Sequence, residues 1–430
     1  MSSPRPNDVP SHPLEWLPEE WQAKLAAWGE QRYRAGQVFR WVHARGVAEP
    51  SAMSDLAKGL RERLSAMSPT LAMPVTVPEV RDASDGTRKL LVALTAGGSV
   101  ESVLIPQTRA SVDAMLLQPD DADEEDDADE SASGAQRGRG WGPEELPAES
   151  GEGQQDRQPP KGAARQTPEP TRVTQCISTQ VGCAMGCVFC ASGVAGLARN
   201  MTAAEIVAQV LVGRALVTEG ERLSHVVLMG MGEPLHNYEA TARALRLLTH
   251  PEGIGLSTRH VTVSTSGLVP EIDRLGREFE GRINLAVSLH ATTDEQRSAL
   301  MPINKRYPLA VLLGALARYP LPKRRRITIE YTLVAGQNDS VADATRLVKL
   351  LRPLRVKVNL IPMNPIDAST LEPPDGANVD RFQDVLRDAG YSVFVRRRRG
   401  GDIAAACGQL ALSAELAKRR VRVPMAPAAR

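Results

Sequence analysis

Long apolar runs are missing from this sequence, and the longest one, Leu309 to Ala317, has nine residues. A membrane-spanning helix needs about 20, so we expect no such span. The N-terminal residues also lack the apolar core of a secretory signal peptide. These absences argue against the membrane and secreted classes, and we expect a soluble, cytoplasmic protein.

Cysteine is scarce as well. The 430 residues include five cysteines, of which four lie between Cys176 and Cys190 and the fifth is Cys407. Five cysteines in a large intracellular chain form a poor disulfide framework. Thiols crowded together in a reducing compartment indicate metal binding or catalysis instead.

Net charge is low, +1, because an acidic segment offsets a basic remainder. Residues 107–171 contain 16 acidic and 6 basic residues, a net charge of −10, and the rest of the chain carries +11. The acidic segment is rich in Gly, Pro, Gln and Ser, so it cannot bury enough apolar surface to fold. We therefore predict a disordered insertion at 107–171. The basic remainder favours a polyanionic partner such as nucleic acid.

The chain before this insertion shows two patterns. Residues 1–75 hold short amphipathic stretches, which predict a small helical N-terminal domain. Residues 76–106 alternate apolar and polar side chains around a turn at Asp85 and Gly86. This alternation predicts a β hairpin-like unit that leads into the insertion.

The chain after the insertion alternates helical stretches with apolar strands. The first of these helices opens with a capping box, in which Glu205 stands three residues after Thr202. Strands buried on both faces and separated by helices predict a parallel sheet, open or curled toward a barrel. Functional residues in such folds lie at the carboxyl ends of the strands. The six strand candidates are residues 174–179, 225–230, 260–265, 283–289, 327–333 and 356–362.

Cys183, Cys187 and Cys190 form a C-x-x-x-C-x-x-C motif directly after the first of these strands. Three thiolates on one short loop can hold three irons of a [4Fe-4S] cluster and leave the fourth iron open to another ligand. A structural zinc ion takes four protein ligands, and Cys176 is the most convincing fourth donor nearby. Zinc binding and unliganded thiols are the alternatives to a cluster.

The cysteine motif, with Phe189 just before its last cysteine, resembles that of the radical S-adenosylmethionine (SAM) enzymes. The segment "MGMGEP" at 229–234 is similar to the Gly-Gly-Glu element of that superfamily. Cys176 in "CISTQVGC" and Cys407 in "GGDIAAACGQL" closely resemble the adenine C2 methyltransferase family that acts on ribosomal and transfer RNA. This resemblance covers nearly the whole chain apart from the two tails and the acidic insertion, and further matching segments are 34–41, 100–106, 301–309 and 359–365.

The resemblance implies a partial (βα)6 TIM-like barrel over residues 172–415, with the [4Fe-4S] cluster on the three motif cysteines. It also implies two SAM molecules per turnover. One methylates Cys407, and the second is cleaved at the cluster to a radical that takes hydrogen from the S-methyl group. The methylene radical adds to C2 of an adenine in 23S ribosomal RNA or in transfer RNA. Glu101 is the implied acceptor of the C2 proton, and Cys176 forms a transient disulfide with Cys407.

Several of these residues also have ordinary structural explanations. Cys407 alone would be a buried structural thiol, and Glu101 alone a solvated strand residue. Ser264 could satisfy a loop amide, and His290 could be a hydrogen-bonded core residue. The resemblance assigns SAM contacts to Gly232, Glu233, Ser264, Ser288, Leu289, His290 and Asn364.

The implied partners are ribosomal RNA, transfer RNA and a flavodoxin-type electron donor, and we expect a monomer with no membrane attachment. Residues 1–75 would assist RNA binding. Three basic runs, which include the C-terminal tail at 416–430, could contact RNA phosphates or could be solvated surface: Lys323 to Arg326, Arg396 to Arg399 and Lys418 to Arg422.

Two other functions stay open from the residues themselves. An adenine C8 methyltransferase of the same class would share the cysteine plan. A redox-sensing iron-sulfur protein that binds RNA without catalysis would need the cluster but not Cys407. The long insertion between Glu101 and Cys176 is the main departure from the family pattern.

Overall fold

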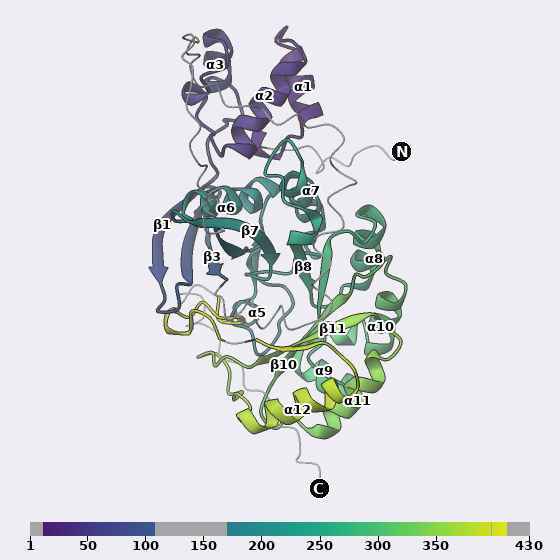
Figure 1. Cartoon of the computed structure of the whole chain (residues 1–430). Helices are drawn as coiled ribbons and strands as arrows, with labels where there is room; N and C mark the ends of the chain where they lie inside the picture. The colour runs from purple at the N-terminus through teal and green to yellow at the C-terminus, as the bar shows by residue number, and fades with distance from the viewer. Residues whose placement is uncertain (1–11, 108–169, 397, 411–430) are drawn as a thin grey trace, which may run out of the picture. The chain divides into compact units, whose positions relative to one another are not determined.

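The computed structural model describes residues 12–107, 170–396 and 398–410 (Figure 1). The chain divides into two units, residues 107–171 and the rest of the chain. The predictions of a disordered insertion at 107–171 and of a basic tail at 416–430 fall almost entirely outside the described residues.

Short helices form the N-terminal part of the described chain. They are a 3-10 helix at Pro13–Glu15, α1 (Pro18–Ala26), α2 (Tyr33–Phe39), which continues into a π-helical turn, and α3 (Lys58–Ser65). Helix α1 begins at a proline, and Glu20 accepts a hydrogen bond from the backbone nitrogen of Leu17 (2.7 Å). The amphipathic stretches in this part of the sequence are therefore helical, as the periodicity predicts.

Three antiparallel strands follow: β1 (Val75–Asp82), β2 (Arg88–Leu94) and β3 (Ser99–Pro106). The turn at Asp85 and Gly86 is confirmed. The hairpin-like unit is not separate from the sheet, however, because β3 pairs with β4 (Thr171–Cys176) and places Val103 opposite Cys176. The two strands that flank the insertion are thus neighbours in one sheet.

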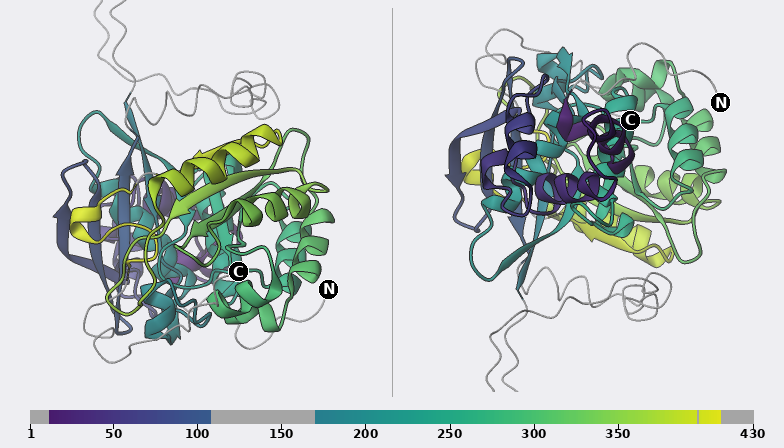
Figure 2. Two further views of the ribbon diagram at one scale, coloured as in Figure 1. Left: turned by 90° about the horizontal axis from the view of Figure 1, so that it is seen from below. Right: turned by 90° about the horizontal axis from the view of Figure 1, so that it is seen from above.

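Ten strands form this sheet in the order β1-β2-β3-β4-β7-β8-β9-β10-β11-β12. Each pair from β7 to β12 is parallel, and helices lie around the outside of the curved sheet (Figure 2). The partial (βα)6 barrel is confirmed. Its later strands are β7 (Glu221–Leu228), β8 (Val261–Thr265), β9 (Asn284–Ser288), β10 (Ile327–Leu333), β11 (Val356–Pro362) and β12 (Val393–Val395). Its helices are α6 (Ala203–Ala215), α7 (Tyr238–Thr249), α8 (Val269–Glu278), α9 (Asp294–Leu300), α10 (Leu309–Ala317), α11 (Val341–Leu351) and α12 (Gly376–Asp388).

All six predicted strands are present, but two of them begin and end earlier than predicted, the first at Thr171 instead of residue 174 and β7 at Glu221 instead of residue 225. The first strand ends at Cys176 rather than at residue 179, and β7 ends at Leu228 rather than at residue 230. A side chain at Gly230 would lie 2.7 Å from the carbonyl oxygen of Ile177, because the backbone after β7 passes close to the backbone after β4. The prediction also missed β12, of three residues, and a small separate sheet of β5 (Gln180–Gly182) and β6 (Leu197–Asn200).

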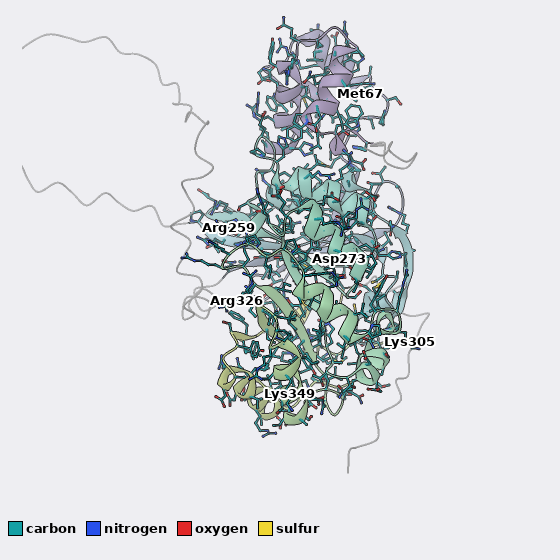
Figure 3. The ribbon with its side chains drawn as sticks, turned by 90° about the vertical axis from the view of Figure 1, so that its right-hand side faces the viewer. Met67, Arg259, Asp273, Lys305, Arg326 and Lys349 are labelled. Atoms are coloured by element: carbon teal, nitrogen blue, oxygen red, sulfur yellow. The ribbon has the colours of Figure 1, made fainter. Side chains whose placement is uncertain are left out.

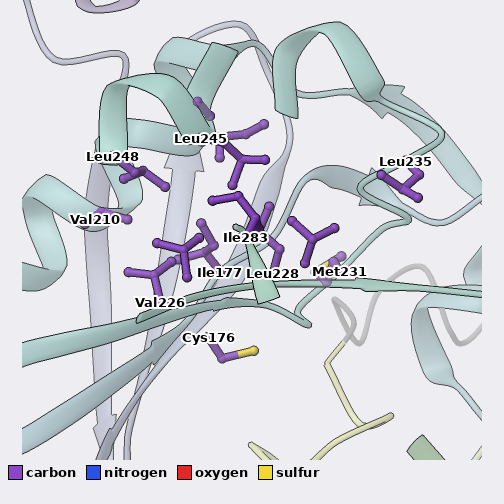
Figure 4. Close-up of a cluster of buried hydrophobic side chains, with 14 of the residues drawn as sticks. Cys176, Ile177, Val210, Val226, Leu228, Met231, Leu235, Leu245, Leu248 and Ile283 are labelled. Carbon is purple, nitrogen blue, oxygen red and sulfur yellow. The ribbon is translucent and has the colours of Figure 1, made fainter. Parts of the chain in front are cut away.

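Buried apolar side chains fill the space between the strands and the helices that cover them. Figure 4 shows Ile177, Val226 and Leu228 packed under Leu245 and Leu248. Cys176 lies apart from this group, on the other side of the strand, because successive side chains of an extended segment point to opposite faces. This alternation turns the Cys176 thiol toward the barrel interior.

Candidate active site

The cysteine motif lies on a loop between β5 and α5 (Ala191–Ala195), so it directly follows β5 and not the first barrel strand, and it lies between the two strands of the small β5–β6 sheet. The backbone nitrogen of Cys183 donates to the carbonyl oxygen of Gly196 (3.0 Å), and that of Val188 donates to Leu300 in α9 (3.1 Å). A side chain at Gly182 would lie 1.8 Å from the oxygen of Gly196. Glycine at this position therefore allows the loop to close.

The three motif thiols line one cavity, of about 160 Å³. Burial raises the pKa of each thiol, to about 12 for Cys183, and neighbouring cysteines raise it further for Cys183 and Cys187. Backbone N–H groups of Gly193 and Ser192 oppose this shift at Cys190. Three negatively charged thiolates can lie this close together only if a cationic group neutralises their charge. A bound metal centre does this, and its binding releases the thiol protons.

This donor set fits a cluster better than a single metal ion. Among the residues that the structure describes, no three Cys, His, Asp or Glu side chains converge as ligands of one ion, which the zinc alternative requires. A cubane cluster binds each thiolate at a different iron, so its ligands stand apart. The all-thiolate character of the loop matches the usual protein ligands of iron-sulfur clusters.

The carboxyl ends of the barrel strands form the rest of the cavity. Gly232 has φ of +105°, and a side chain there would lie 2.6 Å from Cβ of Gln180. Leu289 is fully buried and donates its backbone N–H to Glu330 (3.0 Å), so its SAM contact stays a prediction. The other predicted SAM contacts all line the cavity: Gly232, Glu233, Ser264, Ser288, His290 and Asn364.

Glu233 is buried at the end of β7 and receives backbone N–H groups. Its carboxylate accepts hydrogen bonds from the nitrogens of Ser266 (2.7 Å) and Leu235 (3.1 Å). Burial raises the pKa of Glu233, and the hydrogen bonds from Ser266 act against that rise. A cationic group bound in the cavity beside Glu233, such as an ammonium group, would favour the charged form of this carboxylate.

His290 is a buried residue with φ of +55°. Its Nδ1 accepts the backbone N–H of Thr332 (2.8 Å), so the ring carries its proton on Nε2. Burial, with the positive charge of Arg297, lowers the pKa of His290 to about 3. The ring packs edge-to-face on Phe189, 4.9 Å between centroids, and presents a neutral imidazole to the cavity.

Cys407 lines the same cavity as the three motif cysteines. The side-chain amide of Asn364 donates to the carbonyl oxygen of Cys407 (3.0 Å), and the nitrogen of Ala191 donates to Gly408 (2.8 Å). The distant fifth cysteine is thus held between a barrel strand end and the helix that follows Cys190. All five cysteines are free thiols.

Cys176 and Glu101 lie on neighbouring strands. Ser102 Oγ donates to the oxygen of Cys176 (2.9 Å), and Ser178 Oγ donates to that of Glu101 (2.7 Å). The β3–β4 register places both side chains on one face of the sheet. Burial, and then the proximity of Cys407, raises the pKa of Cys176 to about 12. The insertion therefore does not separate these two residues in space.

Glu101 lines a second cavity, of about 550 Å³, and does not line the cavity of the three motif cysteines, which we call the cysteine cavity. Lys89 pairs with the Glu101 carboxylate (2.9 Å) and also donates to the carbonyl oxygen of Ala404 (3.3 Å). The loop of residues 400–410, which we call the Cys407 loop, lines both cavities. Glu101 therefore lies beside this loop, on a different side from the motif cysteines.

Two further charged residues line the cysteine cavity: Glu330, which no sequence motif indicated, and Arg396, which the sequence indicated only as the start of a basic run. Glu330 is buried and accepts a hydrogen bond from Asn359 (2.8 Å). The proximity of Cys407 raises the pKa of Arg396, whose Nη1 contacts Met229 Sδ (3.8 Å). A carboxylate inside the apolar strand at 327–333 was the signal that could have located Glu330.

The basic runs differ in position. Arg399 pairs with Asp85 (3.8 Å) beside the Cys407 loop. Arg326 donates to Ser392 Oγ (2.9 Å) just before β10. It lies on the same side as Arg259, which precedes β8 (Figure 3), so it is at the amino ends of the strands, whereas their carboxyl ends line the cavity. The run at Lys323 to Arg326 therefore does not line the site.

No helix among the described residues combines the length and hydropathy needed to cross a membrane.

Comparisons with known proteins cover nearly the whole chain. Residues 177–348 match the model of the radical SAM superfamily, and residues 17–69 match that of the ribosomal RNA large subunit methyltransferase N-terminal domain. The dual-specificity RNA methyltransferase RlmN of Sorangium cellulosum is 58% identical, over 96% of this chain and 98% of the relative. The RlmN of Geobacter sulfurreducens is 43% identical, over 91% and 89%. A crystal structure of a radical SAM methyltransferase from Sphaerobacter thermophilus is 39% identical, with a TM-score of 0.74, over 93% of this chain and 99% of that one.

Proposed function

The chain belongs to the RlmN family of dual-specificity RNA methyltransferases, and we propose that its barrel methylates C2 of adenine in ribosomal and transfer RNA through Cys407. It is a radical SAM enzyme whose cofactors are a [4Fe-4S] cluster and SAM. The observation that carries the role of Cys407 is its place in the same cavity as the C-x-x-x-C-x-x-C motif.

We assign the cluster to Cys183, Cys187 and Cys190, which share that cavity. When bound, the cluster and SAM supply reductive radical chemistry. The chain itself lines this space with apolar side chains, of which Met185 and Leu228 are buried and Phe189 is partly buried. Exclusion of water by such side chains protects reactive species from side reactions.

The strand ends would orient SAM. Glu233 would bind the cofactor's ammonium group, and its burial and its hydrogen bonds from backbone N–H groups support this role. His290 would donate from Nε2, because its Nδ1 is already occupied. The backbone of Leu289 and Gly232 and the side chains of Ser264, Ser288 and Asn364 complete the proposed contact set.

Three side chains would act on the substrate and on the methyl carrier. Cys407 carries the methyl group, because a thiolate is both a good nucleophile and a good leaving group. Cys176 later attacks the sulfur of Cys407 to form a disulfide, and the bond between that sulfur and the RNA-bound methylene carbon breaks. The electron pair stays on this carbon, which takes up a proton to become the new methyl group, and the RNA is released. Glu101, held by Lys89, would accept the proton from C2 of adenine.

We further propose the partners and domain roles that the family suggests. Residues 1–75 would assist RNA binding, 76–106 would connect to the barrel of 172–415, and 107–171 would be a disordered spacer. The electron donor would be a flavodoxin-type reductant, and the enzyme would act as a cytoplasmic monomer.

Replacement of Cys407 by alanine tests this function. The Cys407→Ala variant, reconstituted under anaerobic conditions, should bind as much iron as the wild type but transfer no methyl group to RNA. Mass spectrometry of digested RNA should detect 2-methyladenosine only with the wild type. Methylated product from the variant would contradict the proposal, and 8-methyladenosine from the wild type would favour the C8 alternative. If neither the wild type nor the Cys407→Ala variant methylates RNA and both bind RNA and iron equally well, the redox-sensing alternative is favoured.

A further inference from the structure

Arg297 on α9 is a fully buried arginine behind the cofactor cavity. A side chain of this kind is rarely buried without partners. Its guanidinium donates four hydrogen bonds, and the acceptors are the carbonyl oxygens of Leu289 (3.1 Å), Ser266 (2.7 Å) and Ser288 (3.1 Å) and the side-chain oxygen of Asn304 (3.1 Å).

Three of those acceptors belong to the ends of β8 and β9. Ser266 follows β8, and Ser288 and Leu289 end and follow β9. These two strand ends also carry Ser264 and His290, which line the cofactor cavity. The planar guanidinium therefore fixes the distance between the end of β8 and the end of β9, which form two separate parts of the cofactor site.

The positive charge of Arg297 has no carboxylate partner within ion-pair distance among the described residues, since all of its acceptors are carbonyl or amide oxygens. The carboxylate that influences the pKa of Arg297 is Asp294, an exposed residue that accepts a hydrogen bond from the side-chain amide of Asn304 (3.0 Å). Burial lowers the pKa of Arg297 to about 10. A buried cation without a counter-charge destabilises a fold. An anionic group bound near Arg297 would offset this cost.

The cysteine loop lies beside the same helix. Its Val188 nitrogen donates to the carbonyl oxygen of Leu300, at the end of α9 (3.1 Å). Cys187 lines the same cavity as Ser266 and Ser288, whose carbonyl oxygens accept hydrogen bonds from Arg297. A cluster bound by three thiolates carries net negative charge, which would supply the counter-charge that Arg297 lacks.

We propose that Arg297 is a positioning residue that provides the buried positive charge for the cluster and fixes the spacing of the two SAM-binding strand ends. This inference rests on the proposed function, because it takes the cysteine triad as the cluster ligands. Reduction adds an electron to the cluster, so a nearby cation favours the reduced form and raises the midpoint potential. Loss of the cation should make the cluster harder to reduce.

Two substitutions separate charge from hydrogen bonding. Arg297→Gln removes the charge but keeps an amide donor, and Arg297→Lys keeps the charge but loses the planar fork. Each full-length variant is reconstituted anaerobically, and the measurements are iron content, the midpoint potential from an EPR-monitored redox titration, and the SAM dissociation constant. We expect a more negative potential for Gln alone and a several-fold weaker SAM affinity for both variants.

Arg346→Gln is the matched control, because Arg346 is an arginine of α11 whose partner is Asp343. Its potential should equal that of the wild type. A wild-type potential in Arg297→Gln would overturn the proposal. If Arg297→Gln does not fold, Arg297→Lys still tests the proposal. A midpoint potential much more negative than that of the wild type in Arg297→Lys, which keeps the positive charge, would contradict the role of charge. Failure of the wild type to bind iron would instead refute the cluster assignment.

Discussion

Lys89 joins the proposed proton acceptor to the loop that carries the proposed methyl carrier. Its ammonium group lies 2.9 Å from the Glu101 carboxylate and 3.3 Å from the carbonyl oxygen of Ala404. The lysine is buried, so both contacts are shielded from water, and a hydrogen bond to a charged group is then worth more than an exposed one. This one side chain couples two parts of the chain that are more than 300 residues apart in sequence.

Lys89→Met tests this coupling. The substitution keeps the length of the side chain but removes both contacts, so we expect RNA methylation to slow by about 10-fold, with RNA-linked protein accumulating on denaturing gels. Lys89→Arg should recover part of the rate because it restores the charge. Lys58→Met, at an exposed lysine of α3, is the control. A wild-type rate for Lys89→Met would show that the contact has no part in positioning Glu101.

At the scale of elements, α6 supports the strand that carries Cys176. Gln209 of α6 accepts the backbone N–H of Ser178 (3.0 Å) and donates to the carbonyl oxygen of the same residue (2.8 Å). The helix begins with the predicted capping box, in which Thr202 and Glu205 each accept the other's backbone N–H (3.2 and 2.9 Å). Capping α6 thus stabilises the segment between Cys176 and the cysteine loop.

Thr202→Ala should lower the free energy of unfolding by about 1 kcal/mol, because one N–H group of the first turn of α6 loses its acceptor. Urea denaturation followed by circular dichroism measures this change. Thr202→Ser keeps a hydroxyl acceptor and should stay close to the wild type. Equal stability of the alanine and serine variants would mean that the cap contributes nothing.

At the scale of the whole molecule, buried histidines make stability depend on pH. His43 is fully buried against Phe39, and burial, with His250 nearby, lowers the pKa of His43 to about 3 from 6.5. Between these two values the unfolded chain binds a proton at this residue and the folded protein does not. The contribution of His43 to stability is therefore complete above pH 6.5 and is lost as the pH falls toward 3.

His43→Phe should remove this part of the acid sensitivity. At pH 5 the titration of His43 costs the wild type about 2 kcal/mol that the variant does not lose. The measurement is the difference in unfolding free energy between variant and wild type, at pH 8 and at pH 5. The difference should grow in favour of the variant at the lower pH, and a difference independent of pH would refute the assignment.

The local patterns of the sequence determined a large part of this description. Strand periodicity located six barrel strands, and the capping box located the start of α6, because both depend on residues close together in the chain. The motif around Cys183 and its resemblance to a known superfamily indicated the cofactors. None of these inferences needed contacts between distant segments.

Only the tertiary structure decided which residues meet across the barrel. It paired β3 with β4 across the insertion, divided Cys407 and Glu101 between two cavities, and placed Arg297 behind two strand ends. In the sequence, Arg297 and Lys89 are ordinary charged residues. Their burial and partners come from chain segments brought together by folding, and local spacing carries no information about such contacts.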